Sequence, residues 1–276
     1  MSRLDGRVAL VTGAARGLGR SIAVRLAHGG ADIIMVDACR DMSTTSYPGA
    51  TTGELEETAK LVRDAGRHVV AAEVDVRDLE ELTRIVHDAV TDLGRLDIVA
   101  ANAGISTHAP ALTMSDDEWT ETIDVNLSGT WHTCRAAIPH LIEGGRGGSI
   151  VITSAVAGMK AAANSAAYIA ANHGLVGLMR CLALELAPHR VRANTLHPTI
   201  VDTPMAQNEA CYQMWRPDLI APSSEEFAEA TRQIHPTGIP WVDPTEVADA
   251  LAFLVSAEAE HITGAQVPVD GGVIVR

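Results

Sequence analysis

Short runs of branched and apolar residues alternate along the chain with longer segments whose apolar residues recur at helical spacing. The short runs predict strands at residues 8–11, 32–36, 68–74, 96–100, 149–153, 191–196 and 266–269. The longer segments predict a first helix around residues 22–26 and further helices at 54–66, 78–93, 116–127, 127–143, 165–187 and 244–256. Strands separated by helices favour right-handed parallel crossovers. The pattern therefore predicts an α/β protein with a doubly wound parallel sheet of about seven strands, flanked by helices on both faces.

No Pro/Ser-rich stretch or charge run interrupts this pattern, so a single domain spanning residues 1–276 is expected. Hydrophobic residues make up 47% of the chain and aromatic residues only 3%. The core must therefore be built from Ala, Val, Leu and Ile, which suits helices packed closely on a parallel sheet.

The formal net charge of -14 disfavours binding to nucleic acid or to an anionic membrane, since both require basic surface. The N-terminus has no apolar signal region, and no run of about 18 apolar residues occurs, so a soluble cytoplasmic protein is predicted. The four cysteines form no CxxC pair and the eleven histidines form no HExxH motif. Reduced thiols and no metal site are expected.

The first predicted strand opens directly into a glycine-rich turn, residues 12–19, which reads TGAARGLG and is followed by a helical pattern. Glycines let such a turn approach a pyrophosphate, whose charge is met by the amides at the start of the helix. An ordinary turn is the alternative. The strand before the turn and the helix after it favour a dinucleotide site.

The second strand ends at Asp37, about twenty residues beyond the glycines, where a carboxylate accepts hydrogen bonds from the adenosine ribose. A carboxylate repels a 2′-phosphate, so NAD is predicted over NADP. A solvated strand-end Asp is the alternative, and Arg16 and Arg40 keep NADP open. Asp75, after the third strand, is expected to meet the adenine. After the fourth strand, Gly104 lets the backbone of residues 102–104 come close to the cofactor.

Two irregular segments are expected to border this site. Residues 39–53 are polar, turn-forming and long for a connection between a strand and a helix, which predicts a loop that covers the cofactor. Residues 205–240 appear irregular in the sequence, with apolar side chains among polar ones. Beyond the edge of the sheet this segment is interpreted as a substrate lid containing Met205, Met214, Trp215 and Phe227. An ordinary surface subdomain is the alternative.

Candidate chemistry follows the fifth predicted strand, which delivers Ser154 at its carboxyl end, where open α/β sheets bind ligands. Fourteen residues on, Tyr168 precedes Asn172 by four positions within a predicted helix. Residues i and i+4 project from the same side of a helix, so a tyrosine four residues ahead of a cation forms a proton-transfer device. Here the residue four positions after the tyrosine is Asn172, which carries no charge.

Together these motifs closely resemble the short-chain dehydrogenase/reductase family, with its Rossmann-type fold, over residues 5–275. The resemblance rests on the TGxxxGxG turn at 12–19, the NAG tripeptide at 102–104, Asn126, Ser154, Tyr168, the Pro198-Thr199 turn and the closing VDGG at 269–272. Three further features resemble more narrowly the actinobacterial carveol-dehydrogenase-like members: the long insert after Asp37, the HPT and DTPM segments at 197–199 and 202–205, and the PWV tripeptide at 240–242. Those members are mycofactocin-associated enzymes, in which NAD is thought to stay bound while another redox carrier recycles it.

The resemblance implies an enzyme that interconverts a secondary alcohol and its ketone using NAD. Tyr168 would be the general acid/base, Ser154 would orient the substrate oxygen, and Asn126 would hold a water of the proton relay. Ile200 and Thr203 would fix the carboxamide. Cofactor contacts are implied for Gly13, Arg16, Gly17, Leu18, Gly19, Asp37, Asp75, Val76, Asn102, Ala103, Gly104, Tyr168, Asn172, Pro198, Ile200 and Thr203. A homotetramer is also implied, paired through helices 127–143 and 165–187.

The family carries a lysine where this chain has Asn172, and that positive charge lowers the pKa of the tyrosine. Three alternatives follow: an attenuated but working enzyme, an engineered or damaged variant, or a cofactor-binding protein with little turnover. Lys160 could substitute for the charge or be an ordinary loop residue. The apolar lid favours a small cyclic or terpenoid alcohol, and a 3-oxoacyl ester carried by an acyl carrier protein is the rival substrate.

Overall fold

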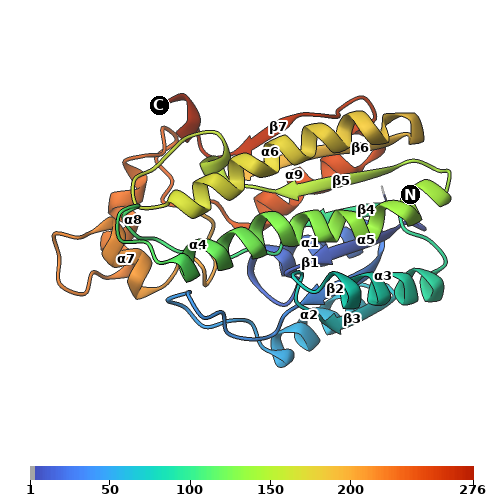
Figure 1. The fold of residues 1–276 in the computed structure, drawn as a ribbon, viewed down its shortest axis with the longest axis horizontal. Helices are drawn as coiled ribbons and strands as arrows, with labels where there is room; N and C mark the ends of the chain where they lie inside the picture. The colour runs from blue at the N-terminus through green and yellow to red at the C-terminus, as the bar shows by residue number, and fades with distance from the viewer. Residues whose placement is uncertain (1–3) are drawn as a thin grey trace.

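A computed structural model of the chain describes residues 4–276 and contains one sheet of seven parallel strands (Figure 1). The strands are β1 (Val8–Thr12), β2 (Asp32–Asp37), β3 (Val69–Glu73), β4 (Ile98–Ala101), β5 (Gly148–Thr153), β6 (Val191–Pro198) and β7 (Gln266–Val269). Their order in the sheet is β3-β2-β1-β4-β5-β6-β7, and every neighbouring pair is parallel. The predicted doubly wound α/β fold is confirmed.

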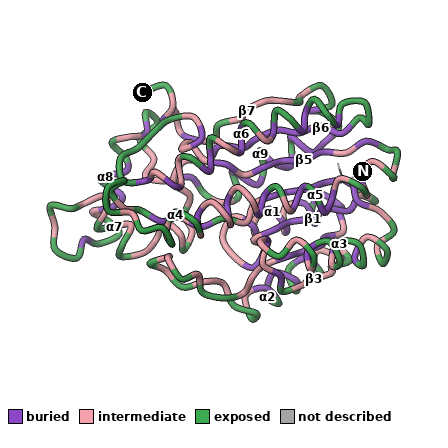
Figure 2. The backbone as a smooth tube through the Cα atoms, in the orientation of Figure 1, coloured by how far each residue is buried: buried purple, intermediate pink, exposed green. Residues whose placement is uncertain are grey.

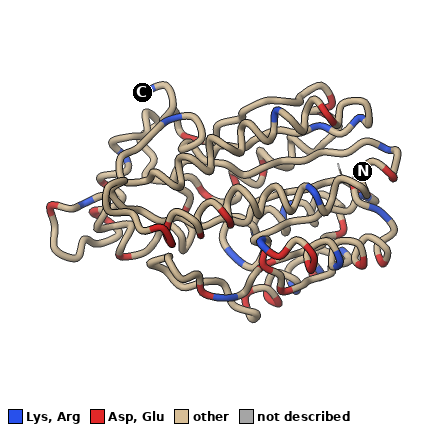
Figure 3. Tube along the Cα trace, viewed as in Figure 1, with Lys and Arg blue, Asp and Glu red and all other residues tan. Residues whose placement is uncertain are grey.

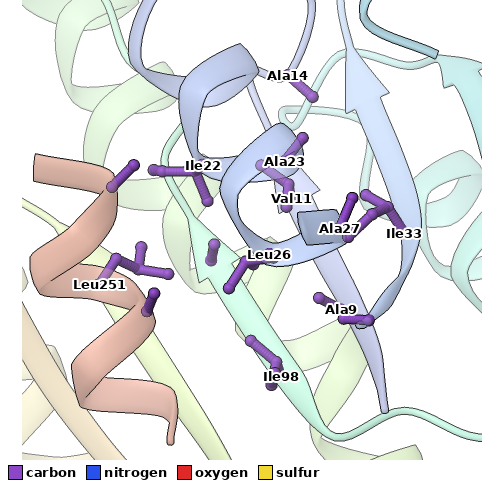
Figure 4. Close-up of a cluster of buried hydrophobic side chains, with 14 of the residues drawn as sticks. Ala9, Val11, Ala14, Ile22, Ala23, Leu26, Ala27, Ile33, Ile98 and Leu251 are labelled. Atoms are coloured by element: carbon purple, nitrogen blue, oxygen red, sulfur yellow. The ribbon is translucent and has the colours of Figure 1, made fainter. Parts of the chain in front are cut away.

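Helices cover both faces of this sheet. They are α1 (Gly17–His28), α2 (Thr52–Asp64), α3 (Leu79–Leu93), α4 (Asp116–Ile123), α5 (Gly129–Glu143), α6 (Ala166–Leu186), α7 (Glu209–Trp215), α8 (Ser224–Arg232) and α9 (Pro244–Val255). Alternate residues of β1 serve the two faces: Ala9 and Val11 pack with α1 and α9, whereas Val8 and Leu10 pack with the side of α3, α5 and α6. Figure 4 shows Leu251 of α9 facing α1 in the first of these cores.

Burial follows the same layers. The strands and the inward sides of the helices are buried, while green, exposed backbone dominates the ends and the lid around α7 and α8 (Figure 2). The segment Ala166–His189 is long and apolar enough by composition to cross a membrane, with a mean hydropathy of 1.2. Since α6 packs against β6 and α4 and supplies the core with buried residues, these contacts account for its apolar composition.

The boundaries of the helices near the site are set by capping residues. Helix α2 begins at Thr52 rather than at the predicted residue 54, because Thr51 and Glu54 form a reciprocal capping box. The break predicted near residue 127 is instead a π-helix, Asp124–Ser128, which joins α4 to α5 without a gap. A local change of hydrogen-bond register leaves no mark on hydrophobic periodicity, so the sequence does not reveal it.

The expectation that residues 205–240 are irregular was wrong in part, because the segment contains α7 and α8. Both helices are short and begin at capping residues, Asn208 and Ser223. Their aromatic side chains gather around the fully buried Phe227. Its ring centre lies 5.0 Å from that of Tyr212, 6.3 Å from that of Trp215 and 5.8 Å from that of Trp241. A chain with few aromatic residues thus concentrates four of them in one cluster that holds the lid together.

Candidate active site

A cavity of about 1020 Å³ lies at the carboxyl ends of the strands. The strand order reverses between β1 and β4, and open α/β sheets bind ligands in the crevice that forms at such a switch point. Every site residue predicted from the sequence lines this cavity: Gly13, Arg16, Gly17, Leu18, Gly19, Asp37, Asp75, Val76, Asn102, Ala103, Gly104, Asn126, Ser154, Tyr168, Asn172, Pro198, Ile200 and Thr203. The fold therefore brings together motifs that are spread over nearly 200 residues of sequence.

The glycine-rich turn is packed so tightly that side chains have no room. A Cβ atom at Gly19 would lie 1.8 Å from the carbonyl oxygen of Gly13, and one at Gly13 would lie 2.8 Å from the Cα of Ala103. Gly13 also has a φ of +68°, which disfavours any L side chain. Thr12 joins the turn to the end of β4, because its Oγ1 accepts hydrogen bonds from the amides of Asn102 (3.1 Å) and Ala103 (3.2 Å). The glycines thus shape the turn itself as well as the approach to a cofactor.

The carboxylate of Asp37 is held in place at the end of β2. Its Oδ2 accepts from the amide of Ala15 at 2.9 Å and its Oδ1 accepts from the amide of Cys39 at 3.2 Å. Each carboxylate oxygen retains capacity for a further donor. Arg16 and Arg40 are the two residues that could have bound the 2′-phosphate of NADP. Both have other partners, since Arg16 donates to the carbonyl oxygen of Pro48 and Arg40 pairs with Asp75. This arrangement favours ribose hydroxyls over a 2′-phosphate.

Asp75, which was predicted to contact the adenine, is held by several hydrogen bonds from arginines. The side chain of Arg77 approaches it through Nη2 at 2.8 Å and Nε at 3.1 Å, and the amide of Arg77 donates at 2.9 Å. Burial acts to raise the pKa of Asp75, but the hydrogen bonds from Arg77 and Arg40 outweigh it and lower the pKa to about 2. Asp75 is therefore ionised at any physiological pH and serves first as an anchor for two arginines.

The loop of residues 39–53 reaches over the cavity and contributes Met42, Thr45, Tyr47, Gly49 and Ala50 to its wall. Glu121 of α4 fixes the loop by accepting from the amide and hydroxyl of Thr44 at 2.9 and 2.7 Å, and from those of Ser43 at 3.4 and 3.1 Å. Arg77 completes this link at 3.3 Å from Glu121. The loop is consequently bound to the body of the protein at a defined point.

Asn126 lies in the π-helix, and both ends of its buried amide are occupied. Oδ1 accepts from the amide of Ile105 at 2.8 Å, and Nδ2 donates to the carbonyl oxygen of Ile105 at 2.8 Å. Its main-chain oxygen accepts from the Thr130 hydroxyl at 2.7 Å. The side chain therefore acts as a clamp on the segment after β4, and the main-chain oxygen, which has a second lone pair, is available to a relay water.

Ser154, Tyr168 and Asn172 form the polar centre of the cavity. The Ser154 hydroxyl lies 3.1 Å from Oδ1 of Asn172 and 3.3 Å from its main-chain oxygen, and it donates to them. The Asn172 amide group donates to the carbonyl oxygen of Tyr168 at 2.9 Å. Burial raises the pKa of the Tyr168 hydroxyl, and the Asn172 side chain lowers it in part. The 3% exposed Asn172 side chain thus bonds along its own helix and to Ser154.

Lys160, the other candidate source of a charge at the site, is engaged away from Tyr168. Its Nζ donates to the main-chain oxygens of Arg276 (2.8 Å) and Val273 (3.4 Å), at the rim of the cavity. No group of three or more His, Cys, Asp or Glu side chains placed to hold a metal ion occurs among residues 4–276.

Sequence reasoning missed a row of polar side chains beside Tyr168. His108 lies 3.0 Å from the Ser165 hydroxyl through Nδ1 and 2.8 Å from the Ser106 hydroxyl through Nε2, and the Tyr47 hydroxyl accepts from the amide of Ser106 at 3.0 Å. The His108 and Tyr168 ring centres are 6.3 Å apart. These residues belong to three separate segments and carry no motif, so only the fold reveals their proximity.

Of the apolar residues in the segment 205–240, Met205, Met214 and Trp215 line the cavity. Phe227, which was expected to line the lid with them, does not line the cavity and is buried beneath it. Its position in the aromatic cluster explains why it does not reach the cavity, because the ring is fully buried among Tyr212, Trp215 and Trp241.

Comparison with known proteins agrees with this geometry. A family model described as enoyl-(acyl carrier protein) reductase matches residues 13–274. The chain is 53% identical to (-)-trans-carveol dehydrogenase from Rhodococcus erythropolis, over 100% of both chains. Carveol dehydrogenase from Mycobacterium avium, crystallised in complex with NAD, superposes with a TM-score of 0.99 at 47% identity, over 100% of both chains. A short chain dehydrogenase from Mycobacterium paratuberculosis, bound to NAD, gives 0.91 at 39% identity, over 99% of this chain and 100% of that one.

These matches and the cavity at the switch point define an α/β oxidoreductase of the dinucleotide-binding type. The chain belongs to the short-chain dehydrogenase/reductase family. The predicted membership and the predicted similarity to carveol dehydrogenases are confirmed.

Proposed function

We propose that this protein is an NAD-dependent oxidoreductase that interconverts a secondary alcohol and its ketone by hydride transfer. The observation that carries the proposal is that one continuous cavity at the sheet edge contains both groups of predicted residues. One end holds the glycine-rich turn and Asp37, and the other holds Ser154 and Tyr168. A dinucleotide lying across the switch point would reach both ends. The relatives named as carveol dehydrogenases and the NAD-bound neighbours support the same activity.

The residues of the cavity fit NAD. Amides at the start of α1 would meet the pyrophosphate, and Asp37 would accept from the adenosine ribose. Thr153, which also lines the cavity, has a buried Oγ1 that no group among residues 4–276 satisfies. A buried hydroxyl without a partner is costly, and rotation of the Thr153 side chain toward the cavity would let a polar group of a bound cofactor or substrate satisfy it. When bound, NAD supplies the hydride acceptor for alcohol oxidation.

At the substrate end, we propose that Tyr168 takes the hydroxyl proton of the alcohol and returns it to the ketone in the reverse direction. Ser154 would hold the substrate oxygen. Because its hydroxyl donates to Asn172 in the structure, Ser154 must rotate before it donates to a ketone oxygen. Asn126 would hold a relay water through its main-chain oxygen.

A second candidate function is NAD binding with little turnover. The observation that favours it is the raised pKa of Tyr168, next to an asparagine without charge. A neutral amide is a weaker aid to a phenolate than a nearby cation. The working enzyme is the better supported of the two, because Ser154 and Tyr168 both line the cavity.

The substrate class proposed is a small cyclic or terpenoid secondary alcohol. Apolar walls from Met205, Met214 and Trp215 support it, as does the similarity to enzymes named for carveol. An acyl carrier protein is the weaker candidate partner. Lysines and arginines are few around α7 and α8 (Figure 3), and an acidic carrier would need them.

The test is oxidation of trans-carveol by the purified protein with NAD, followed by the appearance of reduced nicotinamide. Turnover that disappears in Tyr168→Phe is expected. Turnover that survives this substitution would move the proton acceptor to another residue, and NAD binding without any turnover would favour the second candidate.

We further propose a cytoplasmic homotetramer. Trp131 of α5 and Leu184 of α6 are large apolar side chains that are 44% and 79% exposed on the helices expected to pair. Such side chains are typical of an interface.

A further inference from the structure

The loop of residues 39–53 contributes more than a cover, because it carries Tyr47 to the substrate end of the cavity. The Tyr47 hydroxyl accepts from the amide of Ser106, on the segment after β4. Ser106 in turn contacts His108, which contacts Ser165 just before α6 and lies beside Tyr168. A continuous polar row thus leads from the loop to the proposed proton-transfer residue.

The Tyr47 hydroxyl has a proton to donate. It accepts one hydrogen bond, and no acceptor among residues 4–276 takes its proton. Tyr47 also lines the cavity, so the free donor is available to a ligand there. Burial raises the pKa of Tyr47 to about 12, the amide of Ser106 lowers it, and Tyr168 and Cys211 raise it again. The phenol therefore stays protonated, and two of the groups that influence it belong to the substrate end.

The remaining members of the row are also uncharged. Burial lowers the pKa of His108, so its imidazole is neutral near pH 7. Cations of the cavity wall are engaged by other groups: Lys160 donates to main-chain oxygens and Arg40 pairs with Asp75. Arg16, whose charge lowers the pKa of Tyr47, donates to the carbonyl oxygen of Pro48. The row consequently suits a neutral oxygen, such as a hydroxyl or ketone, rather than a carboxylate.

The position of Tyr47 is fixed by groups outside the cavity. Glu121 accepts four hydrogen bonds from Ser43 and Thr44, a few residues before Tyr47, and its side chain is only 11% exposed. A hydrogen-bond donor that is already fixed in the free protein distinguishes better between ligands with and without a matching acceptor, because little conformational entropy of the loop is lost on binding.

We propose that the Tyr47 hydroxyl binds a second, neutral oxygen of the substrate, so that the enzyme prefers cyclic ketones and alcohols with an additional oxygen function. The inference rests on the proposed function and names its substrate class more closely. Ser154 and Tyr168 serve the reacting oxygen. Tyr47, Ser154 and Tyr168 line the same cavity. Ser106 and His108 join Tyr47 to the neighbourhood of Tyr168, so one small ring can present one oxygen to Ser154 and Tyr168 and another to Tyr47.

The test compares cyclohexanone with 1,4-cyclohexanedione on NADH-loaded protein, in the parent and in Tyr47→Phe. This substitution removes only the hydroxyl and keeps the ring. The parent should bind and reduce the dione about three- to tenfold better, after correction for its two equivalent carbonyls, as one neutral hydrogen bond predicts. Tyr47→Phe should lose this preference, because the affinity for the dione should fall toward that for cyclohexanone. Glu121→Ala, which frees the loop, should weaken the preference and also speed NAD release.

Calorimetric binding separates this inference from the proposed function. Preferential binding of the dione by the parent without reduction of either ketone would refute the proposed function and leave the Tyr47 site standing. An equal preference in parent and Tyr47→Phe would overturn the Tyr47 site, as would failure of both ketones to bind. Faster NAD release from Tyr47→Phe with an unchanged preference would assign Tyr47 to the cofactor instead.

Discussion

Asn172→Lys is the substitution that tests the proposed chemistry most directly. In alcohol oxidation Tyr168 must accept a proton, so its deprotonated form is the active one. Burial raises the pKa of Tyr168, and the neutral Asn172 amide opposes this only in part. A lysine ammonium at this position would stabilise the phenolate. The pKa should fall, and the pH-rate profile for oxidation should move to lower pH.

The magnitude follows from Coulomb's law. A unit charge roughly 5 Å from the phenolate contributes about 3 kcal/mol at an effective dielectric constant near 20. Each pKa unit corresponds to about 1.4 kcal/mol, so the shift is about two units before losses to solvation. Below the pKa of Tyr168, turnover should rise about ten- to hundredfold. Affinity for NAD should change less, because an amide and an ammonium can both donate to a ribose.

The control is Asn172→Met, which has a side chain close to lysine in length but no charge. Both substitutions remove the contacts of Asn172 with Ser154 and with the Tyr168 carbonyl oxygen, so only the charge differs between them. The assay is carveol oxidation with NAD as a function of pH. Ultraviolet titration then gives the pKa of Tyr168 in the parent, Asn172→Lys and Asn172→Met, each compared with the same protein carrying Tyr168→Phe. Equal pKa values in the Lys and Met variants would refute the electrostatic argument. Absence of turnover in Asn172→Lys would favour the NAD-binding role.

Four further outcomes are expected. Calorimetry should give tighter binding of NAD(H) than of NADP(H), because the Asp37 carboxylate repels a 2′-phosphate; equal affinities would contradict this. Shortening the 39–53 loop should speed NAD release in stopped-flow measurements, and unchanged rates would remove its covering role. Phe227→Ala should lower the free energy of unfolding in urea by about 3–5 kcal/mol, because Phe227 is fully buried, with the 41% exposed Phe253→Ala as the control. Light scattering should detect a tetramer, which Trp131→Glu should disrupt; a monomeric parent would exclude this assembly.

The sheet and the dinucleotide end of the site could be predicted because their signals are local. Each strand of this fold is a short apolar run. Gly19, in the first turn of α1, must be glycine because a Cβ there would meet the carbonyl oxygen of Gly13, only six residues earlier. Asp37 follows at a spacing fixed by the length of one helix and one strand. These features can therefore be predicted from a single sequence.

The lid and the polar row beside Tyr168 could not be predicted from the same patterns. Helices α7 and α8 span only 7 and 9 residues, too few for a periodic pattern to stand out from a loop. The contact between Tyr47 and Ser106 joins residues 59 positions apart. Such pairings depend on how the chain returns on itself and have no local signature.

Asn172 shows at a single position what the sequence does and does not predict. Its place on the helix, four residues after Tyr168, follows from sequence, yet the direction of its amide does not. A short side chain at a 3% exposed position can satisfy its polar atoms only with what lies within reach, and here those partners are the Tyr168 carbonyl oxygen and the Ser154 hydroxyl. Asn172 therefore affects two proposed catalytic groups. It places no charge beside Tyr168, and its Oδ1 accepts the proton that Ser154 would offer to a ketone. A ketone can only accept a hydrogen bond, so it binds Ser154 only after the Ser154–Asn172 bond is broken. An alcohol can donate its own proton to the Ser154 oxygen and leaves that bond intact. Asn172→Met, which removes the bond, should therefore increase the affinity for a ketone more than the affinity for an alcohol.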